Sequence, residues 1–206
     1  MSWCEMTWPT ADGILRRDSQ GHGDFKAARR RRQRIYEHKG IDYEARPGAR
    51  VYAPCAGTVR LGRAYSDSPQ EDLLGIAPLA GIEVAVMYIR PLASLANGRH
   101  VEQGELIGHA LSLQARYPGI TDHIHLEIRL KGSRVANHAL DEHVCVDPLL
   151  FMTGPPAGRS SDFQEAVNEG VVHNPAYDVP EDKQRRLHAL WTRVGRLLKA
   201  TIGGEA

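Results

Sequence analysis

The stretch Ile120–Leu130, ITDHIHLEIRL, alternates polar and apolar residues along most of its length. Side chains two positions apart in a β-strand point to the same face of a sheet. The alternation therefore predicts a strand with one apolar and one polar face. The apolar face comprises Ile124, Leu126, Ile128 and Leu130, and the polar face comprises His123, His125, Glu127 and Arg129. Two imidazoles on one strand face indicate a candidate functional site.

Other segments between Gly40 and Met152 also carry strand patterns. ARVYAPCAGTVRLGRAY and HVEQGELIGHAL each suggest two short strands joined by a turn at Gly or Pro. GIEVAVMYIRPL is a richer apolar run, which is typical of a strand buried on both faces. SDSPQEDLLGIAPLAG and SLQARYPGITD are interpreted as loops. The pattern as a whole predicts a mainly β domain.

The C-terminal region has a different pattern. GPPAGRSS, after Thr153, indicates a linker, and PEDKQRRLHALWTRVGRLLKATIGG indicates a basic amphipathic helix that begins at Pro180. The apolar stripe of this helix comprises Leu187, Leu190, Trp191, Val194, Leu197 and Leu198. We expect an irregular N-terminal segment over 1–24, a β domain over 25–153, and a linker with a C-terminal helix over 154–206.

Composition and charge exclude some classes of partner. The chain of 206 residues carries a formal net charge of +1, so no global field favours nucleic acid. The basic runs at 27–34 (AARRRRQR) and 182–199 are interpreted as solvated faces. No apolar segment is long enough to span a bilayer, and membrane association is not expected. The cysteines, Cys4, Cys55 and Cys145, lack metal-ligand spacing and are interpreted as buried or inert thiols, with one disulfide among them as the open alternative.

A second motif lies upstream of the paired histidines, where HKGID places His38 four residues before Asp42. An imidazole and a carboxylate suit a borderline-soft divalent ion such as zinc. These two ligands with one histidine of the His-x-His strand would leave a fourth position for water, as catalytic zinc requires. The other strand histidine would face the same pocket and exchange a proton.

The ordered series HKGID, VYAPCAGTV, VEQGELIG, HIHLEIRLKG and VDPLLF resembles the LytM/lysostaphin-type zinc metallopeptidases, which cleave peptides of bacterial peptidoglycan. The resemblance covers about residues 21–152 and implies a small antiparallel β-sheet groove with loops around a metal site. It implies Zn²⁺ ligation by His38, Asp42 and His125, with His123 as the proton-handling histidine. LSLQARYPGITDHIHLE further resembles a vertebrate branch of the superfamily, the leukocyte chemotaxins, which keeps the zinc site and acts in signalling.

One position departs from the family pattern. Active members carry a further histidine in a Tyr-x-His-Leu motif, whereas this chain has Tyr88-Ile89-Arg90-Pro91. Arginine stays protonated and cannot shuttle protons, although it can donate hydrogen bonds to an oxyanion. We therefore expect Arg90 or Tyr88 to stabilise the tetrahedral intermediate. Tyr88 is more typical of a core aromatic residue on a buried strand than of an oxyanion donor.

Two functions follow from the resemblance. The first is a zinc-dependent endopeptidase for peptidoglycan peptides, such as a delivered antibacterial effector with an inhibitor or immunity protein as partner, or a phage-type lytic enzyme. The second is a non-catalytic, zinc-stabilised binding or signalling module. Residues 1–20 lack the basic start, apolar stretch and cleavage site of a secretory signal. For the enzyme we thus expect non-Sec export to the periplasm or cell wall, and a cytoplasmic location until release.

Overall fold

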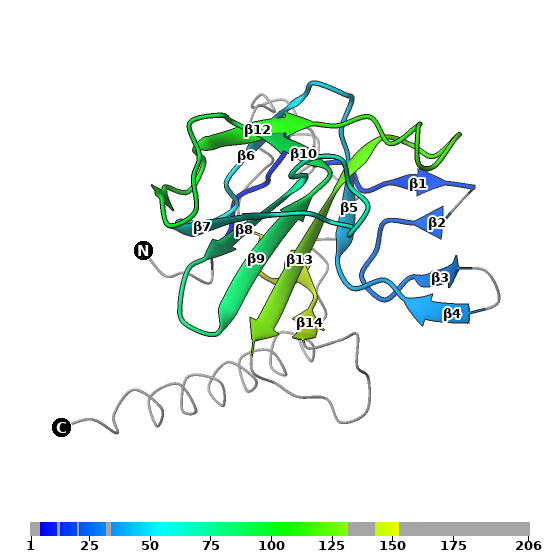
Figure 1. Ribbon diagram of the computed structural model, residues 1–206. Helices are drawn as coiled ribbons and strands as arrows, with labels where there is room; N and C mark the ends of the chain where they lie inside the picture. Colours follow the sequence, from blue (N-terminus) through cyan, green and yellow to red (C-terminus); the bar gives the residue numbers. More distant parts are fainter. Residues whose placement is uncertain (1–4, 12, 20, 32–33, 132–142, 153–206) are drawn as a thin grey trace, which may run out of the picture. The chain divides into compact units, whose positions relative to one another are not determined.

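Figure 1 shows the computed structural model of the protein. The structure describes residues 5–11, 13–19, 21–31, 34–131 and 143–152, and these belong to one compact unit within Met1–Gln164. The linker and helix expected over 154–206 lie outside the described residues.

The described residues form short β-strands and one 3₁₀ helix, and the expectation of a mainly β, antiparallel fold is confirmed. The elements are β1 (Arg17–Asp18), β2 (Gly21–His22), β3 (Ala28–Arg31), β4 (Arg34–Glu37), β5 (Ile41–Glu44), β6 (Arg50–Tyr52), β7 (Gly57–Gly62), β8 (Leu73–Ala77), β9 (Ile82–Met87), β10 (Ile89–Pro91), β11 (His100–Val101), β12 (Leu106–Ala110), β13 (His123–Lys131), β14 (His143–Val146) and η1 (Pro148–Leu150). No helix among these residues is long and apolar enough to cross a membrane.

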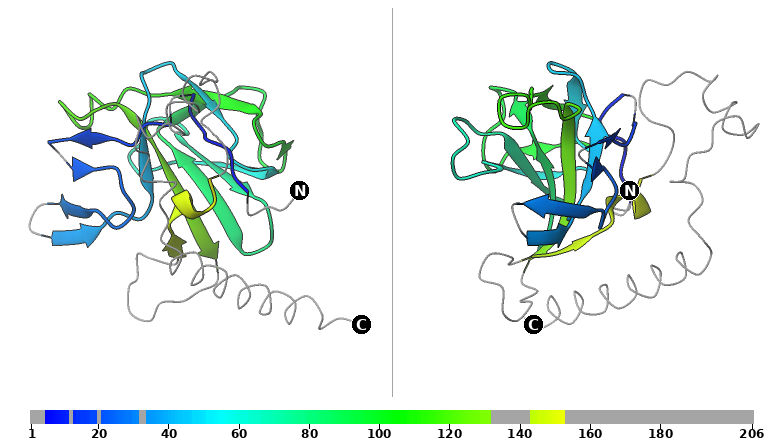
Figure 2. Two further views of the ribbon diagram at one scale, coloured as in Figure 1. Left: turned by 180° about the vertical axis from the view of Figure 1, so that it is seen from behind. Right: turned by 90° about the vertical axis from the view of Figure 1, so that its right-hand side faces the viewer.

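The main sheet has the order β11-β7-β8-β9-β13-β14, and a smaller sheet has the order β10-β12-β6 (Figures 1 and 2). Strand β13 is the centre of the site. It pairs with β9 along one edge, whereas β5 and β14 pair with successive halves of its other edge. All six residues of β9 are buried, as its apolar run predicts.

Both faces of β13 are buried at the site. Ile124, Leu126 and Ile128 lie in the core with exposures of 0–1%, which confirms the predicted apolar face. On the opposite face His123, His125 and Glu127 are also buried. The polar face is therefore covered by other parts of the chain, and its groups must find partners inside the protein.

The N-terminal segment supplies part of that cover. Residues 1–24 are expected to be irregular, but residues 14–16 run antiparallel along the edge of β5 that β13 leaves open. Leu15 forms a bridge with Tyr43, and the Arg16 amide donates to the Asp42 carbonyl at 2.9 Å. This pairing depends on the backbone, so the hydrophobic pattern gives no sign of it.

Cys55 is a free thiol, as interpreted from the sequence. Cys55 is buried, and this burial raises the pKa of its thiol to about 12. Its thiolate, which is the reactive form, is therefore scarce at neutral pH.

Gly40 allows the HKGID segment to approach β13. A Cβ atom at this position would lie 2.1 Å from the Leu126 carbonyl oxygen and 2.9 Å from Cγ of Glu127. Real Cβ atoms do not approach backbone oxygen so closely, so any side chain here would push the HKGID segment away from β13. The glycine thus sets the separation between His38 and Asp42 on one side and His125 on the other.

We expect Gly40→Ala to lower the free energy of unfolding by about 3 kcal/mol, the upper range for overpacking a core, and to weaken zinc binding. Thermal or denaturant unfolding and chelator competition measure the two effects. Gly62→Ala is a matched control, because its Cβ would meet the nearest atom, Leu73 Cδ2, at an ordinary 3.5 Å. Equal stability of the two variants would contradict the steric role of Gly40.

Candidate metal centre

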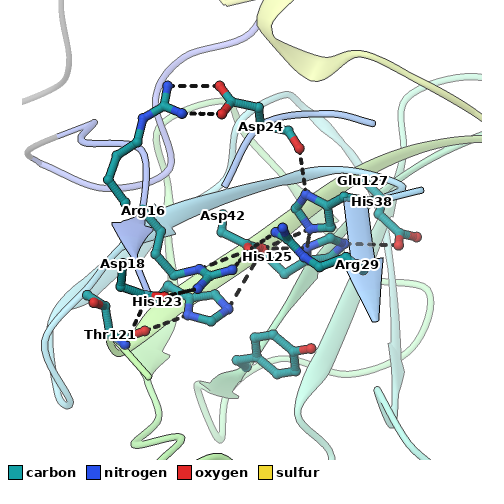
Figure 3. Close-up of polar contacts among 12 residues, drawn as sticks. Arg16, Asp18, Asp24, Arg29, His38, Asp42, Thr121, His123, His125 and Glu127 are labelled. Carbon is teal, nitrogen blue, oxygen red and sulfur yellow. Dashed lines mark hydrogen bonds and ion pairs between the residues drawn. The ribbon is translucent and has the colours of Figure 1, made fainter. Parts of the chain in front are cut away.

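Three predicted ligands converge on one buried point (Figure 3). His38 Nε2 lies 3.0 Å from His125 Nδ1 and 3.1 Å from Asp42 Oδ1. His125 Nδ1 lies 2.8 Å from the same Asp42 oxygen. The register explains the convergence, because Asp42 on β5 stands directly opposite His125 on β13, and His38 precedes β5 by a short segment with a bend at Gly40.

The outer nitrogen of each histidine has its own acceptor. His38 Nδ1 lies 2.8 Å from the Asp24 carbonyl oxygen, and His125 Nε2 lies 2.9 Å from Glu127 Oε1. Both acceptors require an N–H from the ring, so the inner nitrogens, His38 Nε2 and His125 Nδ1, are the ones left for a metal. Orienting contacts of this kind are typical of metal-binding histidines.

The donor set fits a divalent cation. Two imidazole lone pairs and one carboxylate oxygen, each about 3 Å from the next, repel one another unless a positive charge lies between them. Ligand atoms of a tetrahedral zinc, at bonds of about 2.1 Å, lie about 3.4 Å apart, which is within a few tenths of an ångström of this triangle. Three protein ligands leave a fourth position for water or substrate.

His123 lies beside this triangle and is not part of it. Its Nε2 is 3.7 Å from Asp42 Oδ1, and its Nδ1 is 2.6 Å from the Thr121 carbonyl oxygen. The carbonyl can only accept, so Nδ1 carries the proton and the lone pair of Nε2 faces the site. Burial lowers the pKa of His123 and outweighs the opposing charge of Asp42. A neutral imidazole with an inward lone pair is suited to accept a proton.

The second oxygen of Asp42 is held by two guanidinium groups. Arg16 Nε and Arg29 Nη2 donate to Oδ2 at 3.2 and 2.9 Å, and both side chains are almost entirely buried. Burial opposes ionisation of Asp42, but its hydrogen bonds with His125 and His38 hold its pKa well below the usual range. Arg29 belongs to the basic run interpreted as a solvated face, and for this residue that interpretation is wrong.

A row of alternating charges continues from His125 across the sheet. Glu127 accepts from Arg129 at 2.6 Å, and Arg129 and Arg60 both donate to the buried Glu83, at 3.3 and 2.8 Å. Burial opposes ionisation of Glu127, but His125 and Arg129 lower its pKa to about 2. Glu127 is therefore a carboxylate at neutral pH and is able to hold the Nε2 proton of His125.

The two predicted oxyanion donors, Tyr88 and Arg90, lie in different surroundings. The Tyr88 ring meets the His123 ring edge-on, with centroids 5.5 Å apart, and its backbone has a positive φ of 65°. Arg90 is exposed on β10, and its side chain makes no hydrogen bond or ion pair with the described residues. The geometry thus brings Tyr88, and not Arg90, against His123.

Two further tyrosines extend from Tyr88. The hydroxyl of Tyr117 donates to that of Tyr65 at 2.8 Å, and the hydroxyl of Tyr65 lies 2.7 Å from that of Tyr88. Arg116 stacks on the Tyr65 ring at 3.9 Å. Sequence reasoning missed these residues because Tyr65 ends a segment interpreted as two strands and Tyr117 lies in a segment interpreted as a loop, and neither pattern indicates contacts between hydroxyl groups.

Sequence reasoning also missed Arg16, Asp18 and the role of Glu127. The alternation of β13 already places Glu127 on the histidine face and could have indicated it. Arg16 and Asp18 come from a polar segment whose pairing with β5 has no local signal.

The comparisons with known proteins agree with this geometry. Residues 36–137 match Peptidase family M23. The chain is 30% identical over 113 residues to leukocyte cell-derived chemotaxin-2 of Bos taurus, an alignment that covers 54% of this chain and 71% of that protein. It is 35% identical over 117 residues to myeloid protein 1 of Gallus gallus, covering 53% of this chain and 33% of that protein. The chain therefore spans a third of the length of this second relative.

Among solved structures, a mutant catalytic domain of the prophage-encoded M23 protein EnpA from Enterococcus faecalis is similar. The TM-score is 0.43 and the sequence identity is 21%, with coverage of 66% of this chain and 95% of that chain.

We expect zinc affinity to rise with pH in the neutral range. Burial opposes protonation of His125, but Asp42 and Glu127 raise its pKa to about 9 in the metal-free protein. Zinc must displace that proton, so the apparent association constant should rise about tenfold per pH unit from about 7 to 9 and then level off. Calorimetry in buffers of different ionisation enthalpy measures the released proton. An affinity that stays constant across this range would contradict the assignment.

Proposed function

Because the chain belongs to peptidase family M23, we propose that it is a zinc-dependent endopeptidase that hydrolyses peptide bonds in bacterial peptidoglycan. One observation carries the proposal: an open set of three ligand atoms lies beside a neutral histidine whose lone pair faces the same point. A purely structural metal site is closed by four protein ligands and needs no adjacent base.

The residues divide into ligands and a base. His38, Asp42 and His125 would hold Zn²⁺, which, when bound, lowers the pKa of water and polarises a carbonyl group. Nε2 of His123 accepts the proton of the attacking water while Thr121 holds the opposite nitrogen protonated. His123 then gives this proton to the leaving amine as the carbon–nitrogen bond breaks, so it ends neutral and ready for another cycle.

We assign the oxyanion to Tyr88 in preference to Arg90. Tyr117 donates to Tyr65, which directs the proton of Tyr65 toward Tyr88 and leaves the Tyr88 proton for a substrate oxygen. Burial is the main cause that raises the pKa of Tyr88, so the hydroxyl keeps its proton at neutral pH. A phenol that donates into a desolvated site is a common means of stabilising a tetrahedral intermediate.

We expect Tyr88→Phe to lower kcat about 100-fold, the effect of losing one oxyanion donor, with zinc content unchanged. Arg90→Ala should leave kcat within about threefold of the wild type, because a side chain in solvent provides little stabilisation to the transition state. Steady-state kinetics on a soluble muropeptide measures both variants. The opposite order of effects would transfer the role to Arg90.

The proposed substrate is tested by mass analysis of digested sacculi. The zinc-loaded protein should release fragments with new amine termini, and a chelator should abolish them. His123→Ala should keep the metal but reduce cleavage at least about 100-fold, the typical contribution of a general base. Sacculi of several wall types should be included, because loop shape around the site selects the bond that is cut.

A second candidate function is a non-catalytic, zinc-stabilised binding or signalling module. Arg90 in place of the expected histidine favours it, as does the identity with a leukocyte chemotaxin. The absence of chelator-sensitive products from every wall type in the same assay would select this function.

The setting of the enzyme is also a proposal. We propose that it acts in the periplasm or cell wall after non-Sec export, as an antibacterial effector or a phage-type lytic enzyme. Peptidoglycan peptides would be its substrates and an inhibitor or immunity protein its partner.

A further inference from the structure

We propose that Arg16 and Asp18 are positioning residues that connect the metal ligand Asp42 to the base His123 and hold this base in its proton-accepting tautomer. Both precede the region 36–137 that matches the family. The inference rests on the role of His123 proposed above, but its main readout is the state of the imidazole itself.

Backbone pairing places Arg16 beside Asp42. The Arg16 amide donates to the Asp42 carbonyl at 2.9 Å, and the Glu44 amide donates to the Ile14 carbonyl at 2.8 Å. Gly23 binds the backbone of both residues. Its amide donates to the Arg16 carbonyl at 2.7 Å, and its carbonyl accepts from the Asp42 amide at 2.9 Å. A Cβ on Gly23 would lie 2.6 Å from the Asp42 carbonyl oxygen, so only glycine fits here.

The side chains then form a continuous path from ligand to base (Figure 3). Arg16 donates through Nε to Asp42 Oδ2 at 3.2 Å and through Nη1 to both oxygens of Asp18 at 2.8 and 2.9 Å. Oδ2 of Asp18 also accepts the Thr121 amide at 3.0 Å. The Thr121 carbonyl, in turn, accepts the Nδ1 proton of His123 at 2.6 Å.

Burial of Arg16 and Asp18 strengthens the hydrogen bonds between them. The Arg16 side chain is 2% exposed and that of Asp18 is 13% exposed. A guanidinium removed from water needs carboxylate partners, and Arg16 has two, one of which holds Thr121. Two contacts therefore fix Thr121, one on its amide and one on its carbonyl, so the carbonyl keeps a constant direction toward His123.

The direction of that carbonyl determines which ring nitrogen carries the proton. With Nδ1–H held by Thr121, Nε2 is free to accept a proton in the site. If Thr121 moves, the two tautomers of a neutral imidazole become comparable in energy, and part of the population presents an N–H where a lone pair is needed.

The test compares zinc-loaded wild type, Asp18→Ala, Asp18→Asn and the control Arg99→Met. Arg99 pairs with Glu105, and neither residue contacts the path from Asp42 to His123, so the loss of this surface ion pair should have little effect. The tautomer of His123 is measured from its ¹⁵N chemical shifts, zinc affinity by chelator competition, and kcat and KM on a soluble muropeptide.

In Asp18→Ala we expect His123 to change from one Nδ1–H tautomer to a mixture, and kcat to fall about 10- to 100-fold with KM and zinc affinity within about threefold. Asp18→Asn should lie between this variant and the wild type, because its amide oxygen can still accept from Arg16 and Thr121. If Asp18→Ala does not fold, Asp18→Asn carries the same comparison.

Two results would overturn the inference. One is an unchanged His123 tautomer and kcat in Asp18→Ala. The other is a loss of zinc affinity in parallel with kcat, since Asp18 would then act on the ligands and not on the base. Wild-type protein that cleaves no peptidoglycan would contradict the proposed function alone, because the ¹⁵N measurement would still decide the role of Asp18.

Discussion

The site depends on the contacts of one buried group, the carboxylate of Asp42. One oxygen faces the two histidine nitrogens, and the other accepts from two guanidinium groups. A lone carboxylate in this position would be strongly destabilised by the loss of water. Because Arg16 and Arg29 compensate the charge at Oδ2, Oδ1 remains available to a cation. The residues that would hold a metal are thus already arranged around this oxygen.

Side chains along β13 alternate between its two faces, and this alternation places the other groups of the site. His123, His125 and Glu127 share one face, so the proposed base, a candidate ligand and the carboxylate that orients this ligand follow each other at every second residue. The opposite face contributes Ile124, Leu126 and Ile128 to the core. The rigid packing of that apolar face keeps the polar face in register with β5, so core packing and site geometry depend on the same strand.

The structural features that could be predicted are those with a periodic or local pattern in the sequence. The strand of the paired histidines, the apolar run of β9 and the β-rich architecture follow from alternation and apolar runs, and His38 and Asp42 follow from a short motif. The buried arginines do not, because Arg16 and Arg29 resemble surface residues until their carboxylate partner is known. The chain of Tyr65, Tyr88 and Tyr117 is equally invisible, since it joins segments that are remote in sequence through hydroxyl contacts alone.

The bond between the Thr121 amide and Asp18 joins residues 103 positions apart. A growing chain emerges from the ribosome with residues 14–18 first, but their partners on β5 and next to β13 follow much later. Long-range pairing of this kind makes folding slow, because distant segments must meet before the contact stabilises them. The candidate centre therefore cannot form on a nascent polypeptide until β13 has been synthesised, and a translation product truncated before β13 would carry His38 and Asp42 without the histidine that faces them.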